Sequence, residues 1–350
     1  MDSQYSPTRR LVTGYRFQLF TALVAVLAMI WTTALYDIEL DAENHLNEAR
    51  TRTRVQSQVF AEYSRSTLKR VNEFIANIRG DWNGDWVRFA EIVRRGQEAI
   101  DDVTFQVAVI GADGIMLFSN LSRPDDRTDL SDREHFRVHK DDPNADRLFI
   151  SRPLMGKVSR KWSIQMTRPI HNKGRFAGVL VVSVSPSQFV GLAAKLGVQG
   201  KSTMTVVRDS GEVMARFPET ENSLGTILKD APFLGANAPV SGNHRRPATI
   251  DGIDRIFGFA RLPEYGMSFV LGESIDEVLA PHDAYRTKVI NVALAATVLA
   301  MTLIFLLSRS LGTVSATRKE LRTILELSPT PSSRSTATCG CATAAPPSSA

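Results

Sequence analysis

Two histidines are the first residues in this chain whose types and spacing could do chemistry. His135 and His139 lie four positions apart in SDREHFRVHK, so on a helix their rings project from one face, as zinc-binding histidines often do. The neighbouring acid, Glu134, precedes the first histidine, which departs from the His-Glu-x-x-His zinc pattern. The only cysteines, Cys339 and Cys341, lie near the C-terminus. We therefore expect no metal or other cofactor, and an anion-contacting or pH-sensitive role for one histidine.

Patterns typical of enzymes are missing from the sequence. It contains no phosphate-binding glycine loop, no Gly-x-Ser-x-Gly elbow and no outstanding pair of carboxylates at strand ends. Asp113-Gly114 and Asp209-Ser210-Gly211 have the composition of turns. The net charge is only +5, without a long basic tract, which argues against nucleic-acid binding. We expect a chain that binds a ligand and has no catalytic activity of its own.

The two histidines lie among segments that alternate between strand and turn patterns. Two hairpins are predicted, one over 105–119 with an Asp-Gly turn and one over 162–184 with a turn at 172–174. The strand, turn and strand pattern returns about 95 residues later at 204–216. Segments 248–262 and 267–275 then predict a closing meander, with a turn at 263–266. Two similar α/β modules in tandem follow from this repeat.

Two long apolar runs, 17–36 and 289–307, bracket these modules. Neither contains Asp, Glu, Lys or Arg, and each exceeds the roughly 18 residues that mark a membrane-spanning helix. The first is also longer than the apolar core of a signal peptide and lacks a small-x-small cleavage site, so we expect a retained anchor. Basic residues lie outside the two runs, at Arg9, Arg10, Arg16, Arg309, Arg318, Lys319 and Arg322. Acidic residues follow the first run, at Asp37, Glu39, Asp41 and Glu43. The positive-inside rule then predicts two cytoplasmic termini and an external segment over 37–287.

A long helix is expected directly after the first membrane run. Residues 37–77 contain no Gly or Pro and space apolar residues at helical intervals, and Gly80 marks the end before a second helix at 86–100. The apolar stripe of the long helix exceeds what one module needs, which favours a parallel homodimer. Beyond the second membrane run, 309–331 has the pattern of a cytoplasmic signalling helix. Residues 332–350 are a low-complexity tail, and we expect a truncation or a shifted reading frame near Pro331.

This order of elements resembles the double Cache family of bacterial extracytoplasmic sensors, whose modules are PAS-like. The most specific match is LFISRPLMGKVSRKWSIQMTRPI at 148–170, together with SDREHFRVHK and GRFAGVLVVSVSPSQF. The resemblance covers roughly 40–280 and includes sensors joined to diguanylate cyclase or histidine kinase outputs. It implies an α+β fold, in which a long N-terminal helix and two tandem modules with antiparallel sheets are flanked by two transmembrane helices.

The resemblance also implies a ligand site in the membrane-distal module, between the sheet and the helix and loops over it. Carried over, that site comprises Arg133, His135, His139, Arg152, Arg160, Trp162 and Gln165. The guanidinium group of arginine has paired N–H donors that match a carboxylate, and a Trp ring makes a flat apolar wall. A small organic anion is therefore the expected ligand. Arg160 and Trp162 resemble a pair used by amino-acid-binding members. Ser183 and Met155, however, stand where those members have an aspartate and a tyrosine, which argues against amino-acid recognition.

The sequence therefore predicts a membrane-bound bacterial sensor that binds a small extracytoplasmic ligand and signals across the inner membrane. Its output module is missing from this chain; the alternatives are the input portion of a diguanylate cyclase or a two-component histidine kinase, or a chemoreceptor fragment. The expected divisions of the chain are a cytoplasmic N-terminus at 1–16, transmembrane helix 17–36, emergent and connecting helices 37–100, distal module 101–195, proximal module 196–287, transmembrane helix 288–308, signalling helix 309–331 and tail 332–350.

Overall fold

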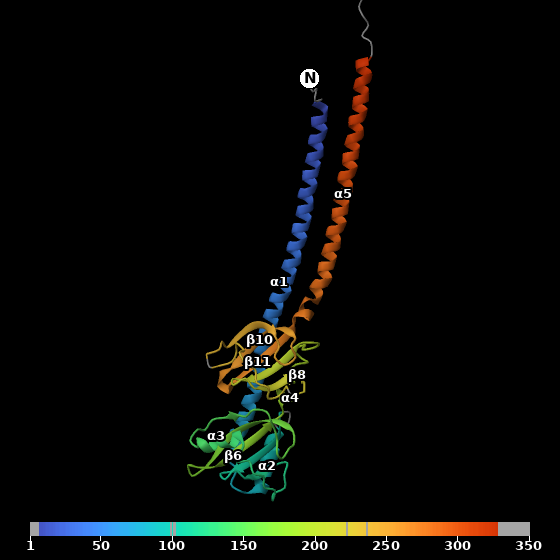
Figure 1. Cartoon of the computed structure of the whole chain (residues 1–350). Coiled ribbons are helices and arrows are strands. Elements are labelled where there is room, and N and C mark those ends of the chain that lie inside the picture. Colours follow the sequence, from blue (N-terminus) through green and yellow to red (C-terminus); the bar gives the residue numbers. More distant parts are fainter. Residues whose placement is uncertain (1–6, 99, 101–102, 222, 236, 328–350) are drawn as a thin grey trace, which may run out of the picture. The chain divides into compact units, whose positions relative to one another are not determined.

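The computed structural model describes residues 7–98, 100, 103–221, 223–235 and 237–327, which are drawn in colour in Figure 1. They belong to two compact units, one formed by Ile38–Arg286 and the other by the described parts of 1–37 and 287–350. The predicted tail at 332–350 lies outside the described residues, as do the ends of the predicted segments 1–16 and 309–331.

Both apolar runs form helices. The first lies in α1 (Pro7–Arg79) and the second in α5 (Ile275–Leu327), and each is long and apolar enough to cross a membrane. Large apolar side chains in these runs are exposed, among them Phe20 at 62 % and Phe305 at 61 %. Exposed apolar surface of this extent needs a hydrocarbon environment or a partner to cover it.

The part of α1 within Ile38–Arg286 forms the spine of the larger unit. Its buried face carries small residues first, Ala49, Thr53 and Ser57, and large ones later, including Phe60 and Leu68. The small residues allow close backbone packing: a Cβ on Gly258 would lie 2.2 Å from the carbonyl carbon of Thr53. The helix backbone therefore lies directly on a strand, which only a glycine permits at that position.

The first sheet has the strand order β2-β1-β6-β5-β3, with β4 pairing β5. Its strands are β1 (Thr104–Gly111), β2 (Met116–Ser119), β3 (Phe149–Ile150), β4 (Leu154–Met155), β5 (Trp162–Asn172) and β6 (Arg175–Val184). Every pairing is antiparallel. The central strand β6 is buried along most of its length because its sequence is a near-continuous apolar run.

Three helices accompany this sheet: α2 (Trp86–Gln97), α3 (Glu134–Asp141) and the short α4 (Pro186–Val190). Asp85 caps α2 by accepting a hydrogen bond from the Arg88 N–H, and Phe89 on its buried face packs edge-to-face on Phe118 of β2. Helix α3 packs on β3, β5 and β6, and α4 packs on β5, β7 and β8. Helix α4 thus packs on strands of both sheets, whereas the main packing of α3 is on the first sheet.

The second sheet repeats this architecture with the order β8-β7-β11-β10-β9. Its elements are β7 (Thr203–Arg208), β8 (Val213–Phe217), β9 (Ser241–Pro247), β10 (Asp254–Leu262), the 3₁₀ turn η1 (Pro263–Tyr265) and β11 (Met267–Ser274). The expected antiparallel α+β fold and its internal repeat are confirmed. The segment expected at 248–262 is a turn followed by β10, and the edge strand β9 was not predicted.

The registers of the two sheets correspond residue by residue. Each first hairpin has an irregularity, between Val109 and Ile110 in one sheet and between Val206 and Val207 in the other. When the two sheets are aligned on this irregularity, the pair Ala108 and Val181 in the first sheet is equivalent to the pair Thr205 and Val270 in the second. On the neighbouring strands, Gln165 opposite Ser183 corresponds to Phe257 opposite Gly272. The modules are therefore structural repeats with different side chains at equivalent positions.

Candidate ligand-binding site

A cavity of about 40 Å³ lies between the first sheet and the elements that cover it. Its floor comes from β1, β2, β5 and β6, and its cover from the start of α3 and the loop after β4. The lining residues are Gln106, Ala108, Met116, Leu130, Arg133, His135, Leu154, Gly156, Lys157, Val158, Gln165, Val181 and Ser183. An apolar interior with a few polar groups at its wall is the usual composition of a small-molecule site.

His135 lines this cavity and carries a buried ring nitrogen, Nδ1, that has no hydrogen-bond partner among the described residues. The residue is only 4 % exposed. Burial, followed by the nearby positive charge of Arg133, lowers the pKa of His135 to about 4, so the ring is neutral at physiological pH. A buried polar atom that is left unpaired costs free energy, which a ligand that bonds to Nδ1 would recover.

Arg133 supplies a positive charge beside that ring. It is the residue immediately before α3 and uses its backbone to begin the helix, accepting hydrogen bonds from the N–H groups of Phe136 and Arg137. Its guanidinium makes no hydrogen bond or ion pair with any described residue, although the side chain lines the cavity. A half-buried guanidinium without a carboxylate partner is available to bind an anion in fork geometry.

Gln165 is held rigidly on the cavity floor. Its Oε1 accepts a hydrogen bond of 2.5 Å from Ser183 Oγ, and its Nε2 donates one of 2.8 Å to Ser163 Oγ. Nearby, Gln106 Nε2 donates to Ser119 Oγ at 3.0 Å. Side chains fixed in this way keep their polar groups in place before a ligand arrives, which reduces the entropy lost on binding.

The loop over the cavity is fastened by a lysine. Lys157 Nζ donates to the backbone carbonyl of Asp129 at 2.8 Å and to Asp132 Oδ1 at 2.9 Å. With the loop in this position the cavity could hold roughly three water-sized groups, because each needs about 10–15 Å³. The segment around Lys157 forms part of the wall, so its movement would enlarge the cavity, and we refer to this segment as the lid.

The seven predicted site residues separate into two groups. Arg133, His135 and Gln165 line the cavity. His139 is buried, but its Nε2 is within hydrogen-bond distance, 2.9 Å, of Thr167 Oγ1 and it belongs to the packing of α3 on β5. Arg152, Arg160 and Trp162 are exposed, Trp162 at 45 %, and do not line the cavity. Their role in ligand contact stays a prediction.

Sequence reasoning did not select Gln106 and Lys157. The alternation of residues along β1 could have indicated Gln106, because it shares a sheet face with Ala108 and is the one polar residue of the run FQVAVI. Lys157 has no such local signal. Its position depends on where the loop after β4 returns toward Asp132.

No described group of three or more His, Cys, Asp and Glu side chains could hold a metal ion. Around the cavity, the donors are a guanidinium, a neutral imidazole, an amide and hydroxyls. These groups are suited to hydrogen bonding with a polar or anionic organic molecule.

The family model described as "Cache domain" matches residues 32–282, so this chain belongs to the Cache domain family. Cache domains are sensory modules, and the matched region contains both sheets and the cavity. The double Cache resemblance seen in the sequence is thereby confirmed. No curated protein matches the chain.

Solved structures of sensor domains share this fold. The extracellular domain of a protein assigned as a histidine kinase is 20 % identical, with a TM-score of 0.60 over 67 % of this chain and 98 % of its own. The ligand-binding domain of the Pseudomonas aeruginosa amino acid chemoreceptor PctB, solved with L-Gln, is 15 % identical, with a TM-score of 0.50 over 65 % of this chain and 92 % of its own. At these identities the likeness shows the fold alone.

Proposed function

We propose that this chain is the sensory part of a bacterial inner-membrane receptor, and that it binds a small organic anion in the cavity beneath α3. The observation that carries the proposal is the pair Arg133 and His135, because both line one cavity and both present polar groups without partners. A carboxylate would neutralise the guanidinium and accept a hydrogen bond from the neutral imidazole, if its proton is on Nδ1.

The lid supports a conformational mechanism. A ligand bound beneath Lys157 would stabilise whichever lid position makes more contacts with it, and it can shift that equilibrium only by its differential affinity for the two positions. Ligand binding would also affect the position of helix α3, because Arg133 immediately precedes the first residue of that helix. Under the proposal, residues 101–195 form the ligand-binding module, and 196–287 with the membrane helices transmit the change to a cytoplasmic output such as a diguanylate cyclase or histidine kinase.

The proposed topology places 37–287 in the periplasm and both termini in the cytoplasm. Two helices with apolar, exposed runs support membrane insertion, and the basic residues outside those runs support the orientation. Reporter fusions placed after 316 and within the loop 218–240 would test it. Cytoplasmic activity of the first and periplasmic activity of the second are expected, and the reverse pattern would overturn the orientation.

A thermal-shift screen of the full chain in detergent micelles tests the ligand class. Small carboxylates should raise the melting temperature more than their amides or amines of equal size. Arg133→Gln should weaken the best carboxylate about tenfold or more, since a charge-assisted hydrogen bond contributes roughly 1.5–3 kcal/mol. Arg137→Gln is the matched control, because Arg137 is exposed on the same helix and does not line the cavity.

The same screen distinguishes a ligand that contacts Arg160 and Trp162 from a ligand that binds in the cavity. If Arg160→Ala weakens the ligand while Arg133→Gln does not, the ligand lies on the outer side of the loop and the proposed cavity is wrong. If carboxylates raised the melting temperature no more than the corresponding amides, the proposal that the ligand is an anion would be rejected.

A further inference from the structure

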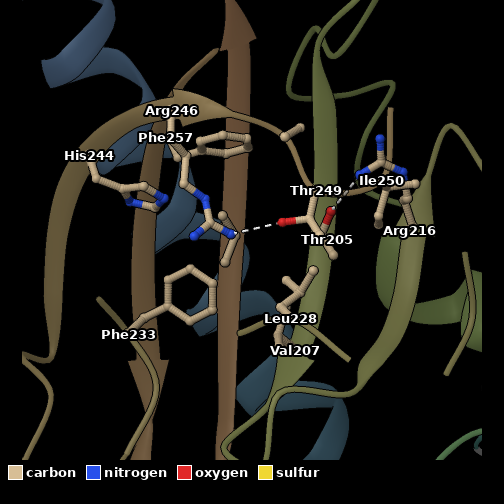
Figure 2. Close-up of a pocket in the computed structure, with 12 residues that line it drawn as sticks. Thr205, Val207, Arg216, Leu228, Phe233, His244, Arg246, Thr249, Ile250 and Phe257 are labelled. Atoms are coloured by element: carbon tan, nitrogen blue, oxygen red, sulfur yellow. Dashed lines mark hydrogen bonds between the residues drawn. The ribbon is translucent and has the colours of Figure 1, made fainter. Parts of the chain in front are cut away.

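A second cavity of about 40 Å³ lies on the second sheet, at the position equivalent to the first (Figure 2). Thr205, Val270 and Phe257 line it, and they are the register equivalents of Ala108, Val181 and Gln165 in the first cavity. The repeat of the fold therefore includes a repeat of the cavity. Its lining is chemically different, since Phe257 stands in the place of Gln165, and Gly272 opposite Phe257 offers no side chain equivalent to Ser183.

Arg246 is one of two arginines that line this cavity. Its Nη2 donates to Thr249 Oγ1 at 3.2 Å, and Nη1 makes only long hydrogen bonds, of 3.4 and 3.5 Å, to the carbonyls of Asp230 and Lys229. Figure 2 shows the guanidinium directed toward Thr249, with the rings of His244 and Phe233 beside it. No carboxylate among the described residues lies within ion-pair distance of Arg246. Its neighbour on β9, Arg245, is instead paired with Asp254.

His244 adds an unpaired polar atom. Its Nδ1 is buried and has no hydrogen-bond partner among the described residues. The ring is held by stacking on Phe257, with a centroid distance of 5.1 Å and an interplanar angle of 18°. Burial, followed by the charge of Arg246, lowers the pKa of His244 to about 4, so the ring is neutral. When the free nitrogen of a neutral imidazole carries the proton, it can donate a hydrogen bond to a carboxylate oxygen.

The local charge balance also favours an anion. Asp251 accepts hydrogen bonds from Arg216 Nη2 at 2.8 Å and from Arg255 Nη1 at 2.6 Å, so two nearly buried guanidiniums share one carboxylate. Arg216 and Arg246 both line the cavity. Three arginines against one aspartate leave a net positive charge in a region of reduced solvent access, where electrostatic attraction to an anion is strong.

From these observations we infer a second ligand site in the membrane-proximal module, one that takes a short-chain monocarboxylate. The carboxylate would bond to Arg246 and His244, and the hydrocarbon part would lie on the apolar lining formed by Val207, Leu228 and Val270. The size of the cavity limits the class: at roughly 10–15 Å³ for each water-sized group it holds about three or four such groups, which suits a carboxylate with a chain of one or two carbons. This site is independent of the cavity beneath α3.

Propionate is a suitable test compound because it combines a carboxylate with a two-carbon chain. Calorimetric titration of the full chain in nanodiscs should show saturable propionate binding, and much weaker binding of propionamide, which has the same shape without the charge. Arg246→Gln should weaken propionate about tenfold or more. Arg245→Gln is the matched control, because it removes an adjacent charge that is already paired, and it should leave the affinity unchanged.

Two further variants make the outcome decisive. Arg246→Lys keeps the positive charge, should fold if Arg246→Gln does not, and should give an intermediate affinity. Arg133→Gln alters only the cavity beneath α3 and should leave propionate binding intact. The second site is overturned if propionate binds no better than propionamide, if Arg245→Gln weakens it as much as Arg246→Gln, or if Arg133→Gln abolishes binding, which would assign propionate to the first cavity.

Discussion

Arg208 Nη1 of the second sheet donates a hydrogen bond of 3.1 Å to Glu134 Oε1 at the start of α3. Glu134 stands between Arg133 and His135, the two residues that carry the proposed ligand site. The Arg208 guanidinium also lies 5.4 Å from the ring centroid of Phe149 on β3, a cation–π distance. This contact joins α3, which covers the cavity on the first sheet, to strand β7 of the second sheet.

Replacing this arginine should weaken the connection between the modules. Arg208→Gln is expected to cost only about 1 kcal/mol of stability, because the ion pair is partly exposed. It should, however, reduce the ligand-induced change in amide hydrogen exchange along β7, with ligand affinity nearly unchanged. Lys201→Gln removes an exposed pair with Asp276 and serves as the control. An unaltered exchange response in Arg208→Gln would show that the coupling follows another route.

Gly258 should not tolerate a side chain. A Cβ at this position would lie 2.2–2.4 Å from backbone atoms of Thr53 and Arg54. Gly258→Ala should therefore destabilise the chain by about 1–3 kcal/mol, the usual cost of overpacking, and lower its melting temperature. Gly80→Ala is the control, since nothing lies within 4 Å of a Cβ there. Equal melting temperatures for the two variants would contradict direct packing of the helix backbone on β10.

Asp251 should be far more important for stability than a surface acid. Asp251→Asn would leave the nearly buried guanidiniums of Arg216 and Arg255, with side chains 4 % and 2 % exposed, without their shared carboxylate. The expected loss is about 3–5 kcal/mol. Asp276→Asn, which breaks an exposed pair with Lys201, should cost less than about 1 kcal/mol. Melting curves of both variants provide the comparison, and similar losses would refute a buried network.

Stability should fall on mild acidification because of the buried histidines. His135, His139 and His244 have pKa values lowered from 6.5 to about 4, each chiefly by burial. Between these values the unfolded chain takes up protons that the folded chain does not, so stability is complete above about pH 6.5 and declines toward pH 4. Each histidine contributes a slope of up to about 1.4 kcal/mol per pH unit.

Thermal melts between pH 7.5 and 4.5 would measure this slope. His135→Asn should show a shallower decline than the natural chain. Asp146, whose pKa is lowered to about 2 chiefly by its hydrogen bond from Arg79, changes its contribution only at lower pH and does not interfere. Identical slopes for variant and natural chain would mean that His135 is not kept neutral.

A parallel homodimer through α1 can be tested with single cysteines. Val55, Val59 and Tyr63 are 47 %, 47 % and 43 % exposed and lie on the face opposite the buried stripe, where a second copy would cover them. Cysteines at these three positions should crosslink in membranes, and Arg54→Cys, exposed on another face, should not. Equal crosslinking at all four positions, or none, would argue against this interface.

Local sequence patterns predicted most of the elements. The helices and hairpins follow from apolar periodicity and from turns such as Asp113-Gly114, which act over short distances. Strand β9, SGNHRRP, was missed because it is polar and contains Gly and Pro; it is a strand because it pairs with β10 at the sheet edge. Its residues His244 and Arg246 were consequently not considered as binding groups.

The site was predictable only where an element fixes the direction of a side chain. Arg133 and His135 follow from α3, and Gln165 from β5. The loop before β5 cannot be read in this way: Arg160 adopts a positive φ of 51°, and its backbone N–H bonds to the carbonyl of Gly156. That turn leaves Arg160 and Trp162 on the outer surface, which residue types alone do not indicate.

The backbone contact between Thr53 and Gly258 is a point about which α1 can pivot. The helix segment that includes Phe60, Leu68 and Ile75 lies beyond this point, and the segment with Ala49 lies before it. Sliding the helix along its axis would drive the next side chains into the strand, whereas rocking it about Gly258 leaves the backbone contact in place. A shift of the first sheet that reached α1 would therefore tilt this part of the helix about Gly258 more readily than slide it along its axis.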